Sequence, residues 1–84
     1  MELHEKIESI DSKDQLVDFL SALKSDFSQN KEDWENPNLE RYLDAMEAWT
    51  GSWENLYKNT GREFPEQPTW SMVAEMLYAA KIYE

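Results

Sequence analysis

A row of carboxylates supplies the side chains in this sequence that are best suited to acid–base chemistry. Glu40 and Asp44 stand one helical turn apart, and Glu47 and Glu54 continue the row. A general acid in such a row must be buried so that its pKa rises toward neutrality. At helical spacing all four fall opposite the apolar residues, so we expect a solvated face that binds a basic partner rather than a catalytic site.

Metal and nucleophilic chemistry find little support in the sequence. The chain has no cysteine and one histidine, His4, which is too few nitrogen and sulfur ligands for a zinc site. The acidic stretch 30–38 lacks the glycine turn of a calcium loop, and Gly51 and Gly61 are too far apart for a phosphate loop. No histidine is placed to activate a serine. We therefore expect no enzymatic activity and no cofactor, and a small enzyme using carboxylate chemistry is the least favoured alternative.

The composition favours a small, folded, acidic domain. The 84 residues include 18 acidic and 8 basic side chains, which gives a formal net charge of -10. Such charge is typical of disordered chains, but 13% of the residues are aromatic, and a packed tryptophan buries ~150–250 Å². We expect one domain over residues 1–84, with residues 1–8 frayed.

The charge also restricts the classes of partner. A chain this acidic repels phosphate backbones and anionic lipid surfaces, so we expect neither a nucleic-acid nor a membrane partner. The apolar runs are too short to span a membrane, and residues 1–6 lack the basic start and apolar stretch of a signal peptide. Because cysteine is absent as well, we expect a cytoplasmic protein.

The elements that position these side chains are predicted to be all α-helical, in a small bundle of three main helices. Ser12 and Gln15 form a capping-box pair, and apolar residues follow at helical spacing as far as Phe27. These signals predict a first helix over 12–28, followed by a short helical turn over 31–35. No stretch alternates long enough to predict a convincing strand.

A second helix is predicted over 37–58. Asn36 is a strong N-cap residue, and Pro37 is preorganised for the first helical position. From Leu39 onward the apolar residues fall on one arc, and they hold this phase through Gly51. We therefore expect one long helix rather than two short ones, with Gly51 on its polar face.

The last helix is predicted over 70–83, after an extended, proline-containing connector at 62–69, and it carries two apolar stripes. A helix that is apolar on all sides is normally buried, so we expect it to lie between the other two helices. The alternative is that its methionine-rich stripe mediates self-association as a homodimer, because methionine adapts to irregular contacts. This stripe consists of Met72, Met76, Ala79 and Tyr83.

Several motifs from residue 34 onward follow one another as in a known family. They are Trp34-Glu35-Asn36, Pro65-x-x-Pro68-x-Trp70 and the terminal Ala79-Ala80-x-x-Tyr83-Glu84. In this order and spacing the sequence resembles a family of small, acidic bacterial proteins of unknown function, over roughly residues 16–84. The resemblance implies a short single-domain chain and brings no activity, cofactor or catalytic residue.

We therefore expect a non-enzymatic protein-interaction module. The first hypothesis is that its acidic helical face, from Glu40 to Glu54, docks a basic partner protein. The alternative is an immunity-like inhibitor of a basic bacterial toxin, because the size, acidity and helicity are similar to those of immunity proteins. Their tyrosine-rich recognition motif is not found in this sequence, and a likeness of fold class is a weak warrant for function.

Overall fold

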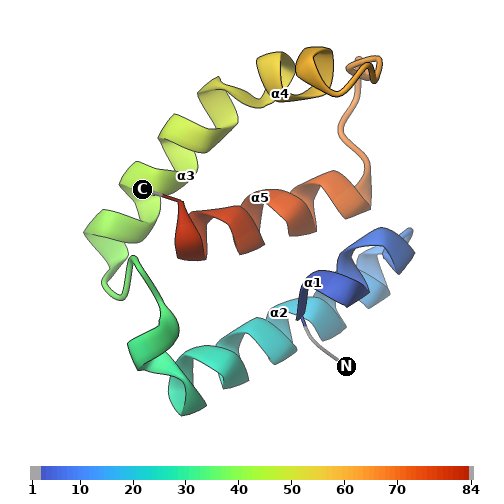
Figure 1. Cartoon of the computed structure of the whole chain (residues 1–84). Helices are drawn as coiled ribbons and strands as arrows, with labels where there is room; N and C mark the ends of the chain where they lie inside the picture. Colours follow the sequence, from blue (N-terminus) through green and yellow to red (C-terminus); the bar gives the residue numbers. More distant parts are fainter. Residues whose placement is uncertain (1–2, 84) are drawn as a thin grey trace.

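The computed structural model describes residues 3–83, and within this range every regular element is a helix. Figure 1 shows one helix running through the middle of the molecule, with the other helices on both sides of it. The all-α prediction is confirmed, whereas the chain divides into more helices than the three that were expected. The elements are α1 (Leu3–Lys6), η1 (Ile7–Ser9), α2 (Lys13–Gln29), η2 (Lys31–Asp33), α3 (Leu39–Gly51), α4 (Trp53–Asn59) and the central α5 (Trp70–Ile82).

Helix α2 begins close to where the capping signal places it. Ser12 is the N-cap, and its Oγ accepts a hydrogen bond from the backbone N–H of Gln15 at 3.2 Å. The reciprocal bond differs from a standard capping box, because Gln15 Oε1 accepts from the N–H of Asp11 at 2.7 Å. The predicted short turn after α2 is confirmed as the 3₁₀ helix η2.

The second helix begins later than the Asn-Pro signal predicts. Its N-cap is Asn38, whose Oδ1 accepts a hydrogen bond from the backbone N–H of Arg41 at 2.9 Å. Asn36 and Pro37 lie outside the helix, so the predicted start is wrong by two residues. The two asparagines that flank the proline are equivalent as local caps. Which one caps the helix is decided by contacts of Asn36 with a distant segment, described below.

The prediction of one continuous helix over 37–58 is wrong, because the chain breaks at Ser52 into α3 and α4. The Ser52 N–H donates to the carbonyl of Trp49, three residues back, at 3.1 Å. Its hydroxyl donates at 3.3 Å to the Ala48 carbonyl that a regular helical N–H would reach, and such serine bonds bend helices. The tightened turn preserves the hydrophobic phase, so Trp49 and Trp53 are both buried, with ring centroids 5.0 Å apart.

Gly51, the last residue of α3, occupies a position where a side chain fits. Its φ is not positive, and an added Cβ would meet nothing within 4 Å. We expect Gly51→Ala to stabilise the protein by about 0.5–1 kcal/mol, because alanine loses less backbone entropy in a helix. Gly61 is the matched control: its φ is 73°, so Gly61→Ala should destabilise by about 1–2 kcal/mol. Thermal unfolding measures both effects. A lower Tm for Gly51→Ala would contradict the conclusion that a side chain fits at this position of α3.

Two apolar clusters join the outer helices to α5, one on each side of it. The first lies between α5 and the N-terminal half of the chain, and its buried residues are Ile7, Ile10, Phe19, Leu23, Trp34 and Ala74. The second lies between α5 and the α3–α4 pair, and its buried residues are Trp49, Trp53, Tyr57, Met72 and Ala79. The expected placement of the last helix between the other helices thus agrees with the structure.

Residues 3–8 are helical and pack on the rest of the molecule, whereas fraying was expected for residues 1–8. Ile7 and Ile10 are buried against α2 and α5, and Ser71 Oγ donates a hydrogen bond to the Ile7 carbonyl at 2.7 Å. The segment is too short to show a helical period in the sequence, and its order comes from tertiary packing. The first two residues, included in the frayed segment, lie outside the described range.

The connector from α4 to α5, which was predicted to be extended over 62–69, has no regular secondary structure there and bends at residues 66–67. Phe64 packs edge-on against the rings of Trp53 and Tyr57, at centroid distances of 6.1 and 5.4 Å. The guanidinium of Arg62 lies 4.1 Å from the centroid of the Tyr57 ring. Thr69 ends the connector as the N-cap of α5, with its hydroxyl accepting a backbone N–H of the first turn at 3.1 Å.

Candidate functional site

The four carboxylates predicted to bind a partner are exposed, but they lie on two helices rather than one. Glu40, Asp44 and Glu47 follow one another along α3 and are called the acidic row below. Glu54 lies on α4, beyond the break. Within residues 3–83 none of the four forms an ion pair. The acidic row is therefore open to a basic partner, and it lacks the burial that a general acid needs.

An exposed apolar strip borders the acidic row on α3. The sequence places Leu39 and Leu43 on the buried arc of this helix, yet they are 73% and 51% exposed. At about 100° per residue, the two leucines lie between the buried face of the helix and its carboxylates. This surface of α3 therefore combines exposed apolar groups with adjacent negative charge.

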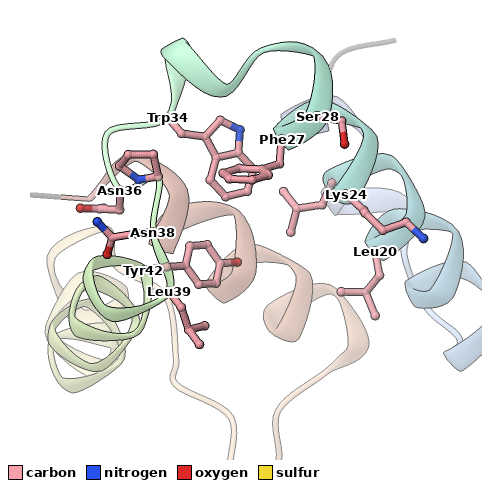
Figure 2. A pocket seen from close by; sticks show the side chains of 11 residues that line it. Leu20, Lys24, Phe27, Ser28, Trp34, Asn36, Asn38, Leu39 and Tyr42 are labelled. Atoms are coloured by element: carbon pink, nitrogen blue, oxygen red, sulfur yellow. The ribbon is translucent and has the colours of Figure 1, made fainter.

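The strip leads into an apolar groove between α2 and α3, shown in Figure 2. Leu20 and Lys24 form its wall on α2, and Leu39 forms its wall on α3. This groove, called the α2–α3 groove below, has a volume of about 370 Å³. It is lined by Leu20, Leu23, Lys24, Phe27, Ser28, Trp34, Asn36, Pro37, Asn38, Leu39 and Tyr42. The lining is mostly aliphatic and aromatic, which is the usual composition of a binding groove.

Tyr42 contributes a neutral, fixed ring to this groove. Its hydroxyl donates a hydrogen bond to the backbone carbonyl of Leu77 in α5 at 2.7 Å, and its ring stacks on Trp34 at a centroid distance of 5.7 Å. Burial raises the pKa of Tyr42 to about 12, so the phenol stays protonated near neutral pH. The helix α3 is thereby attached to α5 directly beneath the groove.

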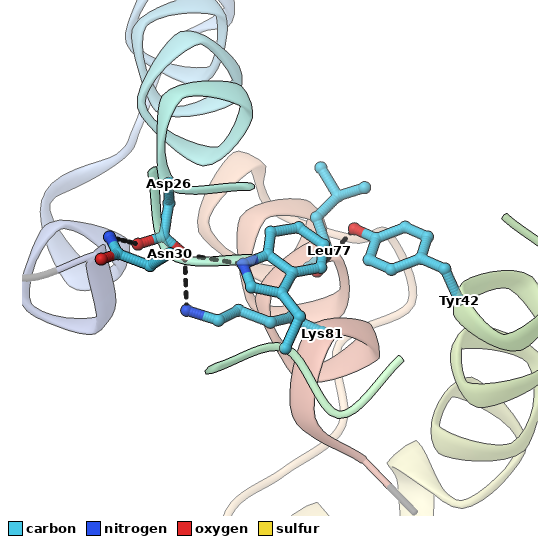
Figure 3. A network of polar contacts seen from close by, with 6 residues as sticks. Asp26, Asn30, Tyr42, Leu77 and Lys81 are labelled. Carbon is cyan, nitrogen blue, oxygen red and sulfur yellow. Dashed lines mark hydrogen bonds and ion pairs between the residues drawn. The ribbon is translucent and has the colours of Figure 1, made fainter. Parts of the chain in front are cut away.

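A polar network centred on Asp26 holds Trp34 in place, and Figure 3 shows Asp26 with its partners Asn30 and Lys81. Asp26 Oδ2 accepts hydrogen bonds from Trp34 Nε1 at 2.8 Å and from Lys81 Nζ at 2.6 Å. Its Oδ1 accepts a further bond from Asn30 Nδ2 at 3.1 Å. The Lys81 ammonium also lies 5.6 Å from the centroid of the Trp34 ring. Asn30 and Trp34, close to Asp26 in the sequence, thus meet Lys81, 55 positions further along the chain, at one carboxylate.

The pKa of Asp26 shows that this carboxylate is a structural anion. Burial alone would raise its pKa, but the hydrogen bonds from Lys81, Trp34 and Asn30, together with the charge of Lys81, lower it below the usual value. A general acid near neutral pH needs a shift in the opposite direction. Asp26 therefore joins α2 to α5 as an anion.

Asn36 closes the C-terminal end of α5. Its Nδ2 donates to the carbonyls of Ala80 at 3.0 Å and Tyr83 at 2.7 Å, and its backbone N–H donates to the carbonyl of Lys81 at 3.2 Å. The last carbonyls of a helix have no partner within the helix. Here one asparagine donates hydrogen bonds to three carbonyls at the end of α5. Trp34 and Asn36 of the first motif thus contact the terminal motif, of which Glu84 lies outside the described residues.

The methionine-rich stripe predicted for self-association faces the core of its own chain. Met72 and Ala79 are buried against the tryptophans of α3 and α4, and Met76 and Tyr83 pack against the same cluster. The buried members are not available on the surface of the monomer, which corrects their assignment to an interface between copies. Homodimerisation itself stays a prediction.

The α2–α3 groove is a site that the sequence analysis missed. The sequence feature that could have revealed it is the width of the apolar arcs of the two helices. Val17 and Leu20 widen the arc of α2, and Leu39 and Leu43 widen that of α3. Apolar residues at the edge of a wide arc are left uncovered when the helix packs on only one neighbour.

In the part of the chain that the structure describes, no acidic or histidine cluster is placed to hold a metal ion. No helix there is long and apolar enough to cross a bilayer.

Of the comparisons with known proteins, the one with family profiles finds a match. No curated protein and no solved structure matches the sequence significantly. The family profile of DUF7660, a family of unknown function, matches residues 12–84. This range holds α2 to α5, the α2–α3 groove, the acidic row and the Asp26 network, and it leaves out α1 and η1. The chain therefore belongs to DUF7660, a family of unknown function.

Proposed function

We propose that the protein is a non-enzymatic interaction module that docks a basic partner protein on the acidic row of α3. The observation that supports this is the exposure of Glu40, Asp44 and Glu47 at successive turns, without an ion pair among residues 3–83. Like charges at this spacing destabilise an isolated helix by a few tenths of a kcal/mol. A partner with lysine or arginine side chains would relieve this repulsion on binding.

The charge of the whole chain acts in the same direction. A formal net charge of -10 attracts basic partners from a distance and raises their association rate. Such steering weakens as salt is added, because exposed charges are screened. Glu54 contributes to this field from α4. An immunity-like inhibitor, in which the basic partner is a toxin, is a special case of the same proposal.

Neutralising the acidic row should weaken partner binding. The variant Glu40→Gln, Asp44→Asn, Glu47→Gln should lower affinity about ten-fold, because each exposed charge pair contributes about 0.2–1 kcal/mol. Three exposed glutamates elsewhere, changed as Glu8→Gln, Glu63→Gln and Glu66→Gln, give a control of equal net charge.

The measurement is parallel affinity capture from the source cell with the wild type, the acidic-row variant and the control variant as bait. The captured proteins should be basic, should bind the wild type and the control alike, and should be lost with the acidic-row variant. Salt should release them as well. Partners that bind all three baits equally would contradict docking on this row.

A further inference from the structure

The α2–α3 groove is part of an apolar surface that the fold leaves uncovered. Besides the leucines of α3, Leu20 at the rim on α2 is 42% exposed, and Val17, one turn before it, is 52% exposed. Leu39 and Leu43 extend the same surface along α3. Soluble proteins rarely expose contiguous apolar surface of this kind except where something binds.

The shape of this surface suits a helical segment. Both walls of the groove are helices, and the aromatic rings of Trp34 and Tyr42 line it between them (Figure 2). Leu39 and Leu43 stand one turn apart on their wall, as Val17 and Leu20 do on theirs. An amphipathic helix presents its apolar side chains at the same spacing, which is how helices bind in apolar grooves.

Charge distinguishes between the occupants that such a groove can take. The acidic row runs along α3 beside Leu39 and Leu43, whereas the opposite wall carries the exposed Lys24. A helix with basic residues on the side facing α3 complements this arrangement. A second copy of this chain, with a formal net charge of -10, would bring like charges together.

We infer that the α2–α3 groove binds an amphipathic helix of the basic partner, with the apolar stripe of that helix in the groove and its lysines or arginines against the acidic row. This inference rests on the proposed function and specifies how the partner is recognised. The carboxylates attract and orient the partner, and the leucines supply the contact area that holds it.

The probe is a synthetic helical peptide with leucines at positions i, i+3, i+4 and i+7 and with lysines along one edge of that stripe. A scrambled peptide of equal composition keeps the charge and removes the stripe. Titration of the full-length protein, followed by NMR, should give about ten-fold tighter binding for the helical peptide than for the scrambled one. The resonances of Leu20, Leu39 and Tyr42 should shift.

Paired substitutions separate the groove from the charge. Leu39→Gln combined with Leu43→Gln should lower the affinity for the helical peptide about ten-fold. Both leucines are exposed, so the fold should persist, which circular dichroism checks. Leu56→Gln is the matched control, because Leu56 is 40% exposed on α4, outside the groove, and its change should leave the affinity unaltered.

Each other outcome overturns a defined part of this inference. Equal binding of both peptides, lost only in the acidic-row variant, would overturn the groove as the site and leave docking on the acidic row intact. No binding of either peptide would overturn the groove as the site of a basic helix, whereas docking on the acidic row is decided by the capture experiment. Self-association of the protein alone, abolished by Leu39→Gln and Leu43→Gln, would overturn the basic helix in favour of a second copy.

Discussion

Asp26→Ala should lower the free energy of unfolding by about 3 kcal/mol, because the carboxylate is the common acceptor of a partly buried network. The side chains of Asp26 and Lys81 are 19% and 11% exposed. Removing the carboxylate leaves the Lys81 ammonium and the Trp34 indole N–H without their acceptor. The tryptophan that lines the α2–α3 groove and the last turn of α5 should both loosen.

Controls on the same helix and in the same network test this explanation. Asp18→Ala removes an exposed aspartate from α2 and should change stability by less than about 0.5 kcal/mol. Asp26→Asn keeps the shape of the side chain and one acceptor but loses the charge. Its loss of unfolding free energy should therefore lie between those of Asp26→Ala and Asp18→Ala. Chemical denaturation measures all three variants. Equal losses for Asp26→Ala and Asp18→Ala would show that the network does not stabilise the fold.

The same network should respond to acid in a defined direction. The folded pKa of Asp26 is lowered, so its stabilising contribution is present above the unfolded pKa, about 3.9. That contribution is lost as the pH falls through the folded pKa. The difference in unfolding free energy between the wild type and Asp26→Asn should therefore be constant near neutral pH and shrink below about pH 4. Comparison with this variant cancels the titration of the other carboxylates.

The parts of the fold that the sequence predicts correctly are set by local interactions. Ser12 and Thr69 cap their helices through a backbone N–H within the first turn, and such bonds need no distant partner. The helix break is also local, yet the sequence analysis missed it. The bond from the Ser52 hydroxyl to Ala48 replaces a backbone bond without changing the hydrophobic phase, so periodicity alone does not detect it.

The parts that were not predicted depend on contacts between distant residues. Asn36 has the local features of an N-cap but bonds to residues 44 and 47 positions further along the chain. The α2–α3 groove arises similarly, because α2 and α3 each pack on α5 and leave the edges of their apolar arcs uncovered. The exposure of Glu40, Asp44 and Glu47 follows from helical phase alone, so these candidate site residues could be placed on the surface.

Asn36→Asp should destabilise the protein more than Asn36→Ala, although aspartate is the closer in shape. Asn36→Ala removes the two amide hydrogen bonds to the carbonyls of Ala80 and Tyr83, a loss of about 2–3 kcal/mol. An ionised aspartate has no donor, and it places a negative charge against carbonyl oxygens at the negative end of α5, so about 3–4 kcal/mol should be lost. Acidification should restore part of this loss, because a protonated carboxyl group can donate one hydrogen bond.

Asn38→Asp is the matched control, since it makes the same chemical change two residues along the chain. Asn38 caps α3 by accepting a hydrogen bond from the N–H of Arg41, and an aspartate accepts as well at the positive end of a helix. Asn38→Asp should therefore leave the Tm within a few degrees of the wild type. Asn36→Asp should lower the Tm by more than about 10 °C, because 1 kcal/mol corresponds to about 4–8 °C in a domain of this size. An amide can donate a hydrogen bond and an ionised carboxylate cannot, so the change from asparagine to aspartate should be costly only where the side chain must donate. If both substitutions shift the Tm equally, the donor role of Asn36 at the end of α5 is wrong.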